Sequence, residues 1–181
     1  MTTRTVAIVG AESTGKSTLA EGLADHFGTF WVPEYLREFV EVQQRTPHEE
    51  DQYPIACEQV AREDAAAGHC TGWLFCDTTP MMTAIYSAHY FGRVDAPLAA
   101  LAARRRYAFT VVTAPDGPWI ADGLQRESAA VRQQIHQQVL DALAARQSAF
   151  VLVRGTLSER IDQVARALLA QASGIDQMPF K

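Results

Sequence analysis

The stretch Gly10–Thr18, GAESTGKST, most constrains how this chain can fold. It has the spacing G-x-x-x-x-G-K-[ST] and directly follows TVAIV (5–9), a continuous apolar run typical of a strand buried on both faces. The next segment, 16–27, carries apolar residues at helical spacing and ends at Gly28. Because this pattern forms a phosphate-binding loop between a strand and a helix, the context favours a P-loop over a surface turn with coincidental spacing.

The residue types in this loop suit a bound triphosphate. Backbone N–H groups of the loop and of the helix N-terminus form a nest for phosphates, and glycine permits backbone conformations that a Cβ would obstruct. Lys16 would place a compact charge on the β- and γ-phosphates, and the Ser17 hydroxyl would bind Mg²⁺. Lys16 is one of two lysines beside fourteen arginines, whose broad planar fork would not fit this position. We expect ATP to be held by Gly10, Glu12, Ser13, Thr14, Gly15, Lys16, Ser17, Thr18 and Arg132.

Strand and helix patterns alternate along the rest of the chain. We predict further strands at 29–33, 73–77, 108–115 and 149–153, and helices at 34–44, 54–68, 79–92, 96–106, 128–147 and 156–171. Pro47 is interpreted as the first position of a helix start, Pro54 as the beginning or kink of the next helix, and TLSE (156–159) as a capping box. This alternation predicts an α/β fold of the P-loop NTPase class, with a parallel five-stranded sheet flanked by helices.

No internal repeat or linker divides the sequence, so we expect one kinase-like domain over 1–181, with a core at about 4–171 and a short tail at 172–181. The net charge of −5, with acidic and basic residues interleaved, argues against a nucleic-acid partner. Cys57, Cys70 and Cys76 form no C-x-x-C pair and are expected to be free thiols. Without a signal peptide or a membrane span, we expect a cytoplasmic protein with a small-molecule partner; the oligomeric state stays open.

Two carboxylates follow predicted strands of this sheet. Glu34 comes directly after the second strand and Asp77 ends the third. Ligands of parallel sheets bind beyond the carboxyl ends of the strands, so both side chains are expected near the P-loop. Phosphoryl transfer uses one carboxylate to accept the proton of the acceptor hydroxyl and another to help hold Mg²⁺. We assign the base to Glu34 and the metal to Asp77, because Asp77 ends the strand beside Ser17.

The segment APDGPWIADGLQRES (114–128) follows the fourth strand, where many small kinases carry a lid loop. Arg126 and Arg132 could close over the phosphates and neutralise charge that develops during transfer. The run Arg104–Arg106 is interpreted instead as a solvated helix end. A P-loop chain can also be a switch GTPase or an ATPase motor, but N/T-K-x-D, long helical arms and a second domain are all missing, which favours a small-molecule kinase.

Several segments together resemble one known family, the ribosylnicotinamide kinase domain of bacterial NadR proteins. They occur in the family's order and span about residues 5–170: GAESTGKSTLAEGLADHFGT, EYLREFV, FCDTTPMMTAIYSAHYFG and PWIADGL. The resemblance implies ATP- and Mg²⁺-dependent phosphorylation of nicotinamide riboside at its 5′-hydroxyl, giving nicotinamide mononucleotide for NAD salvage. By the same resemblance, the acceptor pocket is lined by Glu34, Tyr35 and Arg37, Asp77 lies by the metal and the hydroxyl, and the lid carries Trp119, Asp122 and Arg126.

The sequence also departs from that family. The family's DNA-binding segment and adenylyltransferase domain are missing, so we expect a standalone kinase that neither represses transcription nor completes NAD. Pro33 replaces an aromatic residue before EY, REDAAAG (62–68) lacks another, and DGLQR shifts the lid arginine by one position. The aromatic face for the pyridinium ring must then come from Trp31, Tyr35, Tyr53 or Trp119, and we favour Trp119 or Tyr35. The alternatives are a kinase for another nucleoside or small hydroxyl compound, and a nucleotide-binding regulatory protein without kinase activity.

Overall fold

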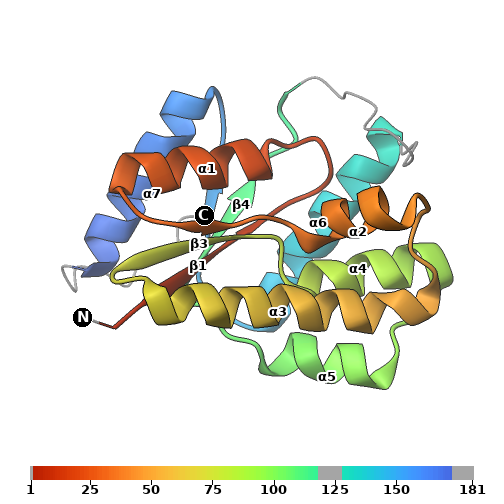
Figure 1. Ribbon diagram of the computed structural model, residues 1–181. Helices are drawn as coiled ribbons and strands as arrows, with labels where there is room; N and C mark the ends of the chain where they lie inside the picture. Colours follow the sequence, from red (N-terminus) through yellow and green to blue (C-terminus); the bar gives the residue numbers. More distant parts are fainter. Residues whose placement is uncertain (1, 118–127, 173–181) are drawn as a thin grey trace.

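The computed structural model describes residues 2–117 and 128–172. Its centre is a five-stranded, wholly parallel sheet in the order β2-β3-β1-β4-β5 (Figure 1). The strands are β1 (Arg4–Val9), β2 (Trp31–Val32), β3 (Trp73–Asp77), β4 (Phe109–Thr113) and β5 (Val151–Val153). Ile8 of β1 pairs with Asp77, and Val9 pairs with Val112 of β4. The carboxyl ends of the three central strands are therefore nearly level, and the P-loop leaves the sheet at this edge.

Helices connect the strands and cover both faces of the sheet. They are α1 (Lys16–Phe27), α2 (Tyr35–Gln43), α3 (Gln52–His69), α4 (Pro80–Phe91), α5 (Ala96–Arg104), α6 (Ala129–Ala145) and α7 (Leu157–Ala172), with a short 3₁₀ helix η1 at Glu49–Asp51. Figure 1 shows α1 and α7 on one side of the sheet and α3, α4 and α5 on the other. The predicted order of strands and helices, and with it the α/β fold class, is confirmed.

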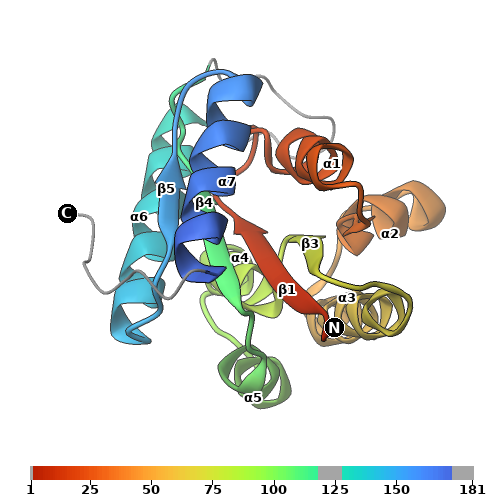
Figure 2. The same ribbon diagram turned by 90° about the vertical axis from the view of Figure 1, so that its left-hand side faces the viewer.

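The two faces of β1 organise two separate parts of the core. Figure 2 shows α1 and α7 on one side of β1. Val6 and Ile8 face this side, where Leu19, Leu23, Val164 and Leu168 are buried against them. Ala7 and Val9 face α4 and α6, where they contact Met82, Ile135 and Val139. Successive side chains of a strand point to opposite faces, so a strand with helices on both sides must be apolar at every position. This explains why TVAIV has no polar alternation.

The region around residues 46–54 differs from the expectation. The helix start lies at Glu49, because the backbone N–H of His48 donates to the Asp51 carboxylate (2.7 Å) and caps η1. Pro47 is thus outside the helix. Pro54 is the third residue of α3, in the first turn, where a missing backbone N–H is tolerated without a kink. The capping box predicted at 156–159 is confirmed, with the Thr156 N–H donating to Glu159 Oε2 at 2.7 Å.

The three cysteines lie in the described part of the chain, and all are free thiols, as expected. Within residues 2–117 and 128–172, no helix combines the length and apolar character needed to cross a membrane.

Candidate functional site

The P-loop wraps closely around the end of β4, which explains its first glycine. Gly10 has φ 152°, and a Cβ at this position would lie 2.2 Å from Thr113 Oγ1. Gly15 has φ 81°, in the left-handed region that glycine adopts without strain, and it stands directly before α1. Ser13 also has a positive φ of 51°. The loop therefore has the conformation that the glycine spacing predicts.

Thr113 and Arg160, which the sequence analysis missed, hold this loop in place through the predicted loop residue Thr14. Thr14 is buried, and its hydroxyl donates to the Ala11 carbonyl (2.7 Å) and lies 2.6 Å from the hydroxyl of Thr113. Arg160 of α7 is buried as well, and its guanidinium donates to the carbonyls of Thr14 and Ala114 and to the Asp116 carboxylate. Thr113 could have been found because it ends a strand next to the P-loop, whereas nothing in the local sequence marks Arg160.

Lys16 lies over the loop that precedes it. Its Nζ donates to the Ala11 carbonyl at 2.9 Å, so the ammonium group is held on the same side as the nest of backbone N–H groups. Glu12 and Ser13 are half-buried in the loop, and Thr18 is exposed in the first turn of α1. The predicted ATP-binding segment is thus continuous in space, from Gly10 to Thr18.

Asp77 and Ser17 meet at the edge of the sheet, as the sequence analysis expected. The Ser17 hydroxyl donates to Asp77 Oδ2 at 2.6 Å. The Asp77 side chain is buried, and burial, followed by the charge of nearby Glu34, raises its pKa to about 6. Lys16 and the Ser17 hydrogen bond act in the opposite direction and favour the carboxylate. Asp77 is therefore an acid whose charge the fold only partly compensates.

The Ser17 hydroxyl and the Asp77 carboxylate together fit a magnesium ion. The second carboxylate oxygen of Asp77, Oδ1, is buried and has no hydrogen-bond partner among the described residues. No group of three or more His, Cys, Asp or Glu side chains in the described part of the chain could hold a metal. Mg²⁺ in nucleotide sites is bound through one or two protein oxygens, with water and phosphate oxygens completing the shell, and the Ser17 hydroxyl and the Asp77 carboxylate are donors of this kind.

Glu34 is positioned by its neighbours on both sides. It precedes α2, its Oε1 accepts a hydrogen bond from the Thr78 hydroxyl (3.1 Å), and its Oε2 lies 3.4 Å from Arg37 Nε. Thr78 has φ 73°, a left-handed conformation that is costly for a β-branched residue. Such backbone strain is typical of functional sites. Thr78 directly follows Asp77 in the chain, and its hydroxyl contacts Glu34. Glu34, Thr78 and Asp77 therefore converge beyond the ends of β2 and β3.

A small cavity of about 30 Å³ opens beside Glu34. Its walls come from α2, α3, the turn after β3 and α4, and they include Leu36, Gln59, Met82 and Tyr86. Gln59 is buried, and its side-chain oxygen accepts from the Tyr35 backbone N–H (2.8 Å), which ties the start of α2 to α3. This cavity marks the acceptor side of the site, and it is much smaller than a pocket that encloses a small-molecule ligand, so an acceptor would have to widen it.

The aromatic residues expected to face the acceptor are distributed differently. Trp31 packs against the core beside α1 and α7, and Tyr53 packs against the buried residues of α3 and α5. Tyr35 has the guanidinium of Arg62 over its ring, 4.4 Å from the centroid. Tyr86 lines the cavity instead, and the sequence analysis missed it. Its position four residues after Met82, on the same face of α4, is the signal that could have revealed it.

The predicted lid falls mostly outside the described residues. Trp119, Asp122 and Arg126 lie in the undescribed segment 118–127. Arg132 is described and is buried, and its guanidinium donates to the Gly117 carbonyl at 2.7 Å rather than projecting into solvent. The interpretation of Arg104–Arg106 as a solvated helix end is wrong for Arg105, which pairs with buried Glu63 (2.8 Å).

Comparison with known proteins identifies relatives of this chain. The trifunctional NAD biosynthesis/regulator protein NadR of Salmonella typhimurium is 33% identical over 141 residues, which is 76% of this chain and 34% of that protein. NadR of Escherichia coli matches with the same identity and coverage. The chain thus spans about a third of the length of the curated relatives it matches. The expected resemblance to NadR is confirmed.

Solved structures show the same fold. NadR in complex with NR superposes with a TM-score of 0.77 at 21% identity, covering 99% of this chain and 54% of that one. Thymidylate kinase from Ehrlichia chaffeensis gives a TM-score of 0.62 at 12% identity and covers 93% and 100% of the two chains. The family model described as an AAA domain matches residues 5–160. With its phosphate-binding loop, its Ser17–Asp77 pair and this match over most of its length, the chain belongs to the AAA domain family.

Proposed function

We propose that this chain is an ATP-dependent kinase that phosphorylates the 5′-hydroxyl of nicotinamide riboside to nicotinamide mononucleotide. The observation that carries the proposal is the Ser17–Asp77 contact beside the P-loop, with Glu34 facing it across the ends of β2 and β3. The choice of acceptor is supported by the relatives, which are NAD biosynthesis proteins, and by the similar fold of NadR in complex with NR. We propose that 1–181 forms a single kinase domain.

On the phosphate side, the backbone nest and Lys16 would bind the β- and γ-phosphates of ATP. Ser17 Oγ and Asp77 Oδ1 would hold Mg²⁺, which when bound would neutralise the negative charge of the phosphates. Asp77 must be ionised for this role, and its pKa of about 6 leaves it mostly ionised at neutral pH. Arg160 keeps the loop in register through the Thr14 carbonyl, so the donors are fixed before the nucleotide arrives.

On the acceptor side, Glu34 would accept the proton of the 5′-hydroxyl. The hydroxyl oxygen then attacks the γ-phosphorus, the bond between that phosphorus and the β–γ bridging oxygen breaks, and ADP leaves with the electron pair. Thr78 and Arg37 orient the Glu34 carboxylate through its two oxygens. Arg126 of the undescribed segment would neutralise charge on the transferred group, with Trp119 and Asp122 beside it, and Tyr35 and Arg37 would contact the acceptor.

ADP release with Mg²⁺-ATP, measured over a panel of nucleosides and small polyols, tests the proposal. Nicotinamide riboside is expected to give the highest kcat/KM, with nicotinamide mononucleotide as the product identified by mass spectrometry. A higher value for another nucleoside would keep the kinase and replace the acceptor. ATP binding without ADP release on any acceptor would favour the regulatory alternative over the kinase.

A further inference from the structure

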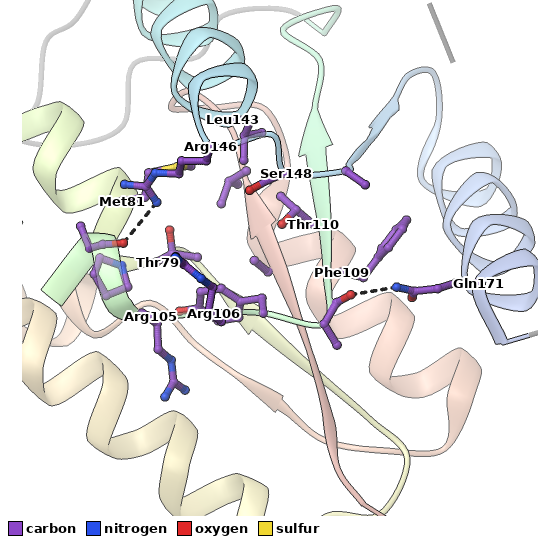
Figure 3. A pocket seen from close by; sticks show the side chains of 17 residues that line it. Thr79, Met81, Arg105, Arg106, Phe109, Thr110, Leu143, Arg146, Ser148 and Gln171 are labelled. Carbon is purple, nitrogen blue, oxygen red and sulfur yellow. Dashed lines mark hydrogen bonds between the residues drawn. The ribbon is translucent and has the colours of Figure 1, made fainter. Parts of the chain in front are cut away.

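A second cavity, of about 180 Å³, lies on the face of the sheet that α4 and α6 cover (Figure 3). None of residues 10–18, Glu34 or Asp77 lines it. Apolar side chains form much of its wall, among them Met81 and Leu143. This cavity is therefore separate from the phosphate and acceptor sites described above.

The charge around this cavity is one-sided. Arg105, Arg106 and Arg146 are among its lining residues, and no Asp or Glu in the described part of the chain joins them. Arg105 turns to α3, where Glu63 and Asp64 neutralise it at 2.8 and 2.7 Å. Arg106 and Arg146 have no carboxylate within ion-pair distance among the described residues. Both arginines are exposed, so their charges are open to an anionic ligand at the mouth of the cavity.

The two arginines also keep most of their donors unused. Arg106 donates to the Ala103 carbonyl at 2.5 Å and Arg146 to the Ala102 carbonyl at 3.2 Å, so both reach the same end of α5. A guanidinium carries five N–H donors, and each of these hydrogen bonds uses one nitrogen. Partial burial and the like charge of Arg106 lower the pKa of Arg146, because the two guanidinium groups repel each other. A bound anion would relieve this repulsion.

The inner wall adds hydroxyl groups. Thr79, Thr110 and Ser148 all line the cavity. The Thr79 side chain is buried, and its Oγ1 has no hydrogen-bond partner among the described residues. A buried hydroxyl without a partner is unfavourable by itself, so a ligand that accepts its hydrogen bond after a small rearrangement would be stabilised.

We infer that this cavity binds a small organic phosphate, with the phosphate between Arg106 and Arg146 and the carbon body against Met81 and Leu143. Guanidinium forks match phosphate oxygens in geometry and form charge-assisted hydrogen bonds with them. The volume exceeds what a phosphate group alone needs, and the apolar wall favours a ligand with a carbon skeleton.

Titration calorimetry with phenyl phosphate tests this, carried out in the Lys16→Ala background so that the P-loop does not contribute binding. Adding Arg106→Gln and Arg146→Gln should weaken phenyl phosphate at least about tenfold, because charge-assisted hydrogen bonds are lost. The matched control adds Arg104→Gln and Arg166→Gln, which remove the same charge from exposed positions outside the cavity, and it should bind as the background does. Circular dichroism melting verifies that all variants fold.

Two further probes sharpen the assignment. Inorganic phosphate should bind more weakly than phenyl phosphate, because it does not reach the apolar wall, and benzoate should bind more weakly because it carries one charge. Equal affinity for phenyl phosphate before and after the Arg106 and Arg146 substitutions would overturn the site. Benzoate binding as tightly as phenyl phosphate would overturn the phosphate specificity.

Discussion

The phosphate side and the acceptor side of the site are built on different kinds of structure. The P-loop is anchored to β4 through Thr14 and Thr113 and continues into α1, four of whose residues are buried. The acceptor side relies on α2, which has no buried residue, and on a cavity of about 30 Å³. The phosphate side is thus fixed by the core, whereas the acceptor side rests on a half-exposed helix.

This difference separates the residues expected to carry out phosphoryl transfer from those expected to select the acceptor. In the proposed kinase, the groups that would act on ATP are held by the core, so their loss should reduce turnover equally for every acceptor. Groups that face the acceptor are carried by α2 and α4, so their loss should change the preference among acceptors. Substitutions on the two sides separate these effects, and they are ordered below from the largest expected effect to the smallest.

Lys16→Ala should reduce turnover by more than about 10³-fold with every acceptor and weaken ATP binding, because the transferred phosphate loses its point charge. Steady-state ADP release and ATP titration measure both effects. Arg166→Ala, an exposed cation on α7, is the matched control and should behave as the unmodified chain. Near-normal turnover of a folded Lys16→Ala variant would rule out the role of the P-loop.

Glu34→Gln should slow the chemical step about 10²-fold at saturating Mg²⁺, because the amide cannot accept the hydroxyl proton. The hydrogen bond from Thr78 can persist to the amide oxygen, so ATP binding should change little. Glu38→Gln on the same helix, where Glu38 pairs with Arg62, is the control. If Glu34→Gln instead raises the Mg²⁺ requirement and leaves the saturated rate intact, the roles of Glu34 and Asp77 must be exchanged.

Asp77→Asn should raise the Mg²⁺ concentration needed for half-maximal rate about tenfold, because the metal loses an anionic ligand. Without metal and nucleotide the variant should be more stable at pH 7. The folded-state pKa of Asp77 is raised from 3.8 to about 6, so its favourable contribution is present below pH 3.8 and is lost as the pH rises through about 6. A midpoint several degrees higher in thermal melts at pH 7, with no difference at pH 3.5, is the expected result. A lower midpoint at pH 7 would contradict it.

The sequence predicted the conformation of the P-loop and the Ser17–Asp77 contact, because local patterns determine them. The spacing of Gly10, Gly15 and Lys16 is read directly from nine consecutive residues, and the position of Asp77 follows from the end of an apolar strand. Pro47 was misplaced because the side chain of Asp51, three residues after His48, caps the helix start at His48. Helix propensities take the proline into account but not the competing cap by a side chain.

The residues that sequence reasoning missed depend on long-range contacts. Arg160 reaches the P-loop from 146 positions away, and Arg105 reaches Glu63 across 42. Neither has a local signal, because an arginine near a helix end is usually solvated. The acceptor side has the same difficulty, since its cavity combines residues of α2, α3 and α4. Helix periodicity places Tyr86 on the face of Met82, but only the packing of α3 and α4 shows that a cavity lies there.

The smallest effect is expected at Tyr86. It lines the acceptor cavity beside Met82, where an aromatic face could receive a flat cationic ring. Tyr86→Leu should raise KM for nicotinamide riboside about two- to tenfold and leave kcat and the KM for ATP unchanged, whereas Tyr86→Phe should retain the ring and stay near the original values. KM values for uridine, adenosine and nicotinic acid riboside, none of which presents a base with a net positive charge, show whether the rise in KM is specific to a cationic ring. An equal rise in KM for all four acceptors would show that Tyr86 only shapes the cavity. An unchanged KM for nicotinamide riboside would remove Tyr86 from the acceptor site and leave Tyr35 or Trp119 as the aromatic face.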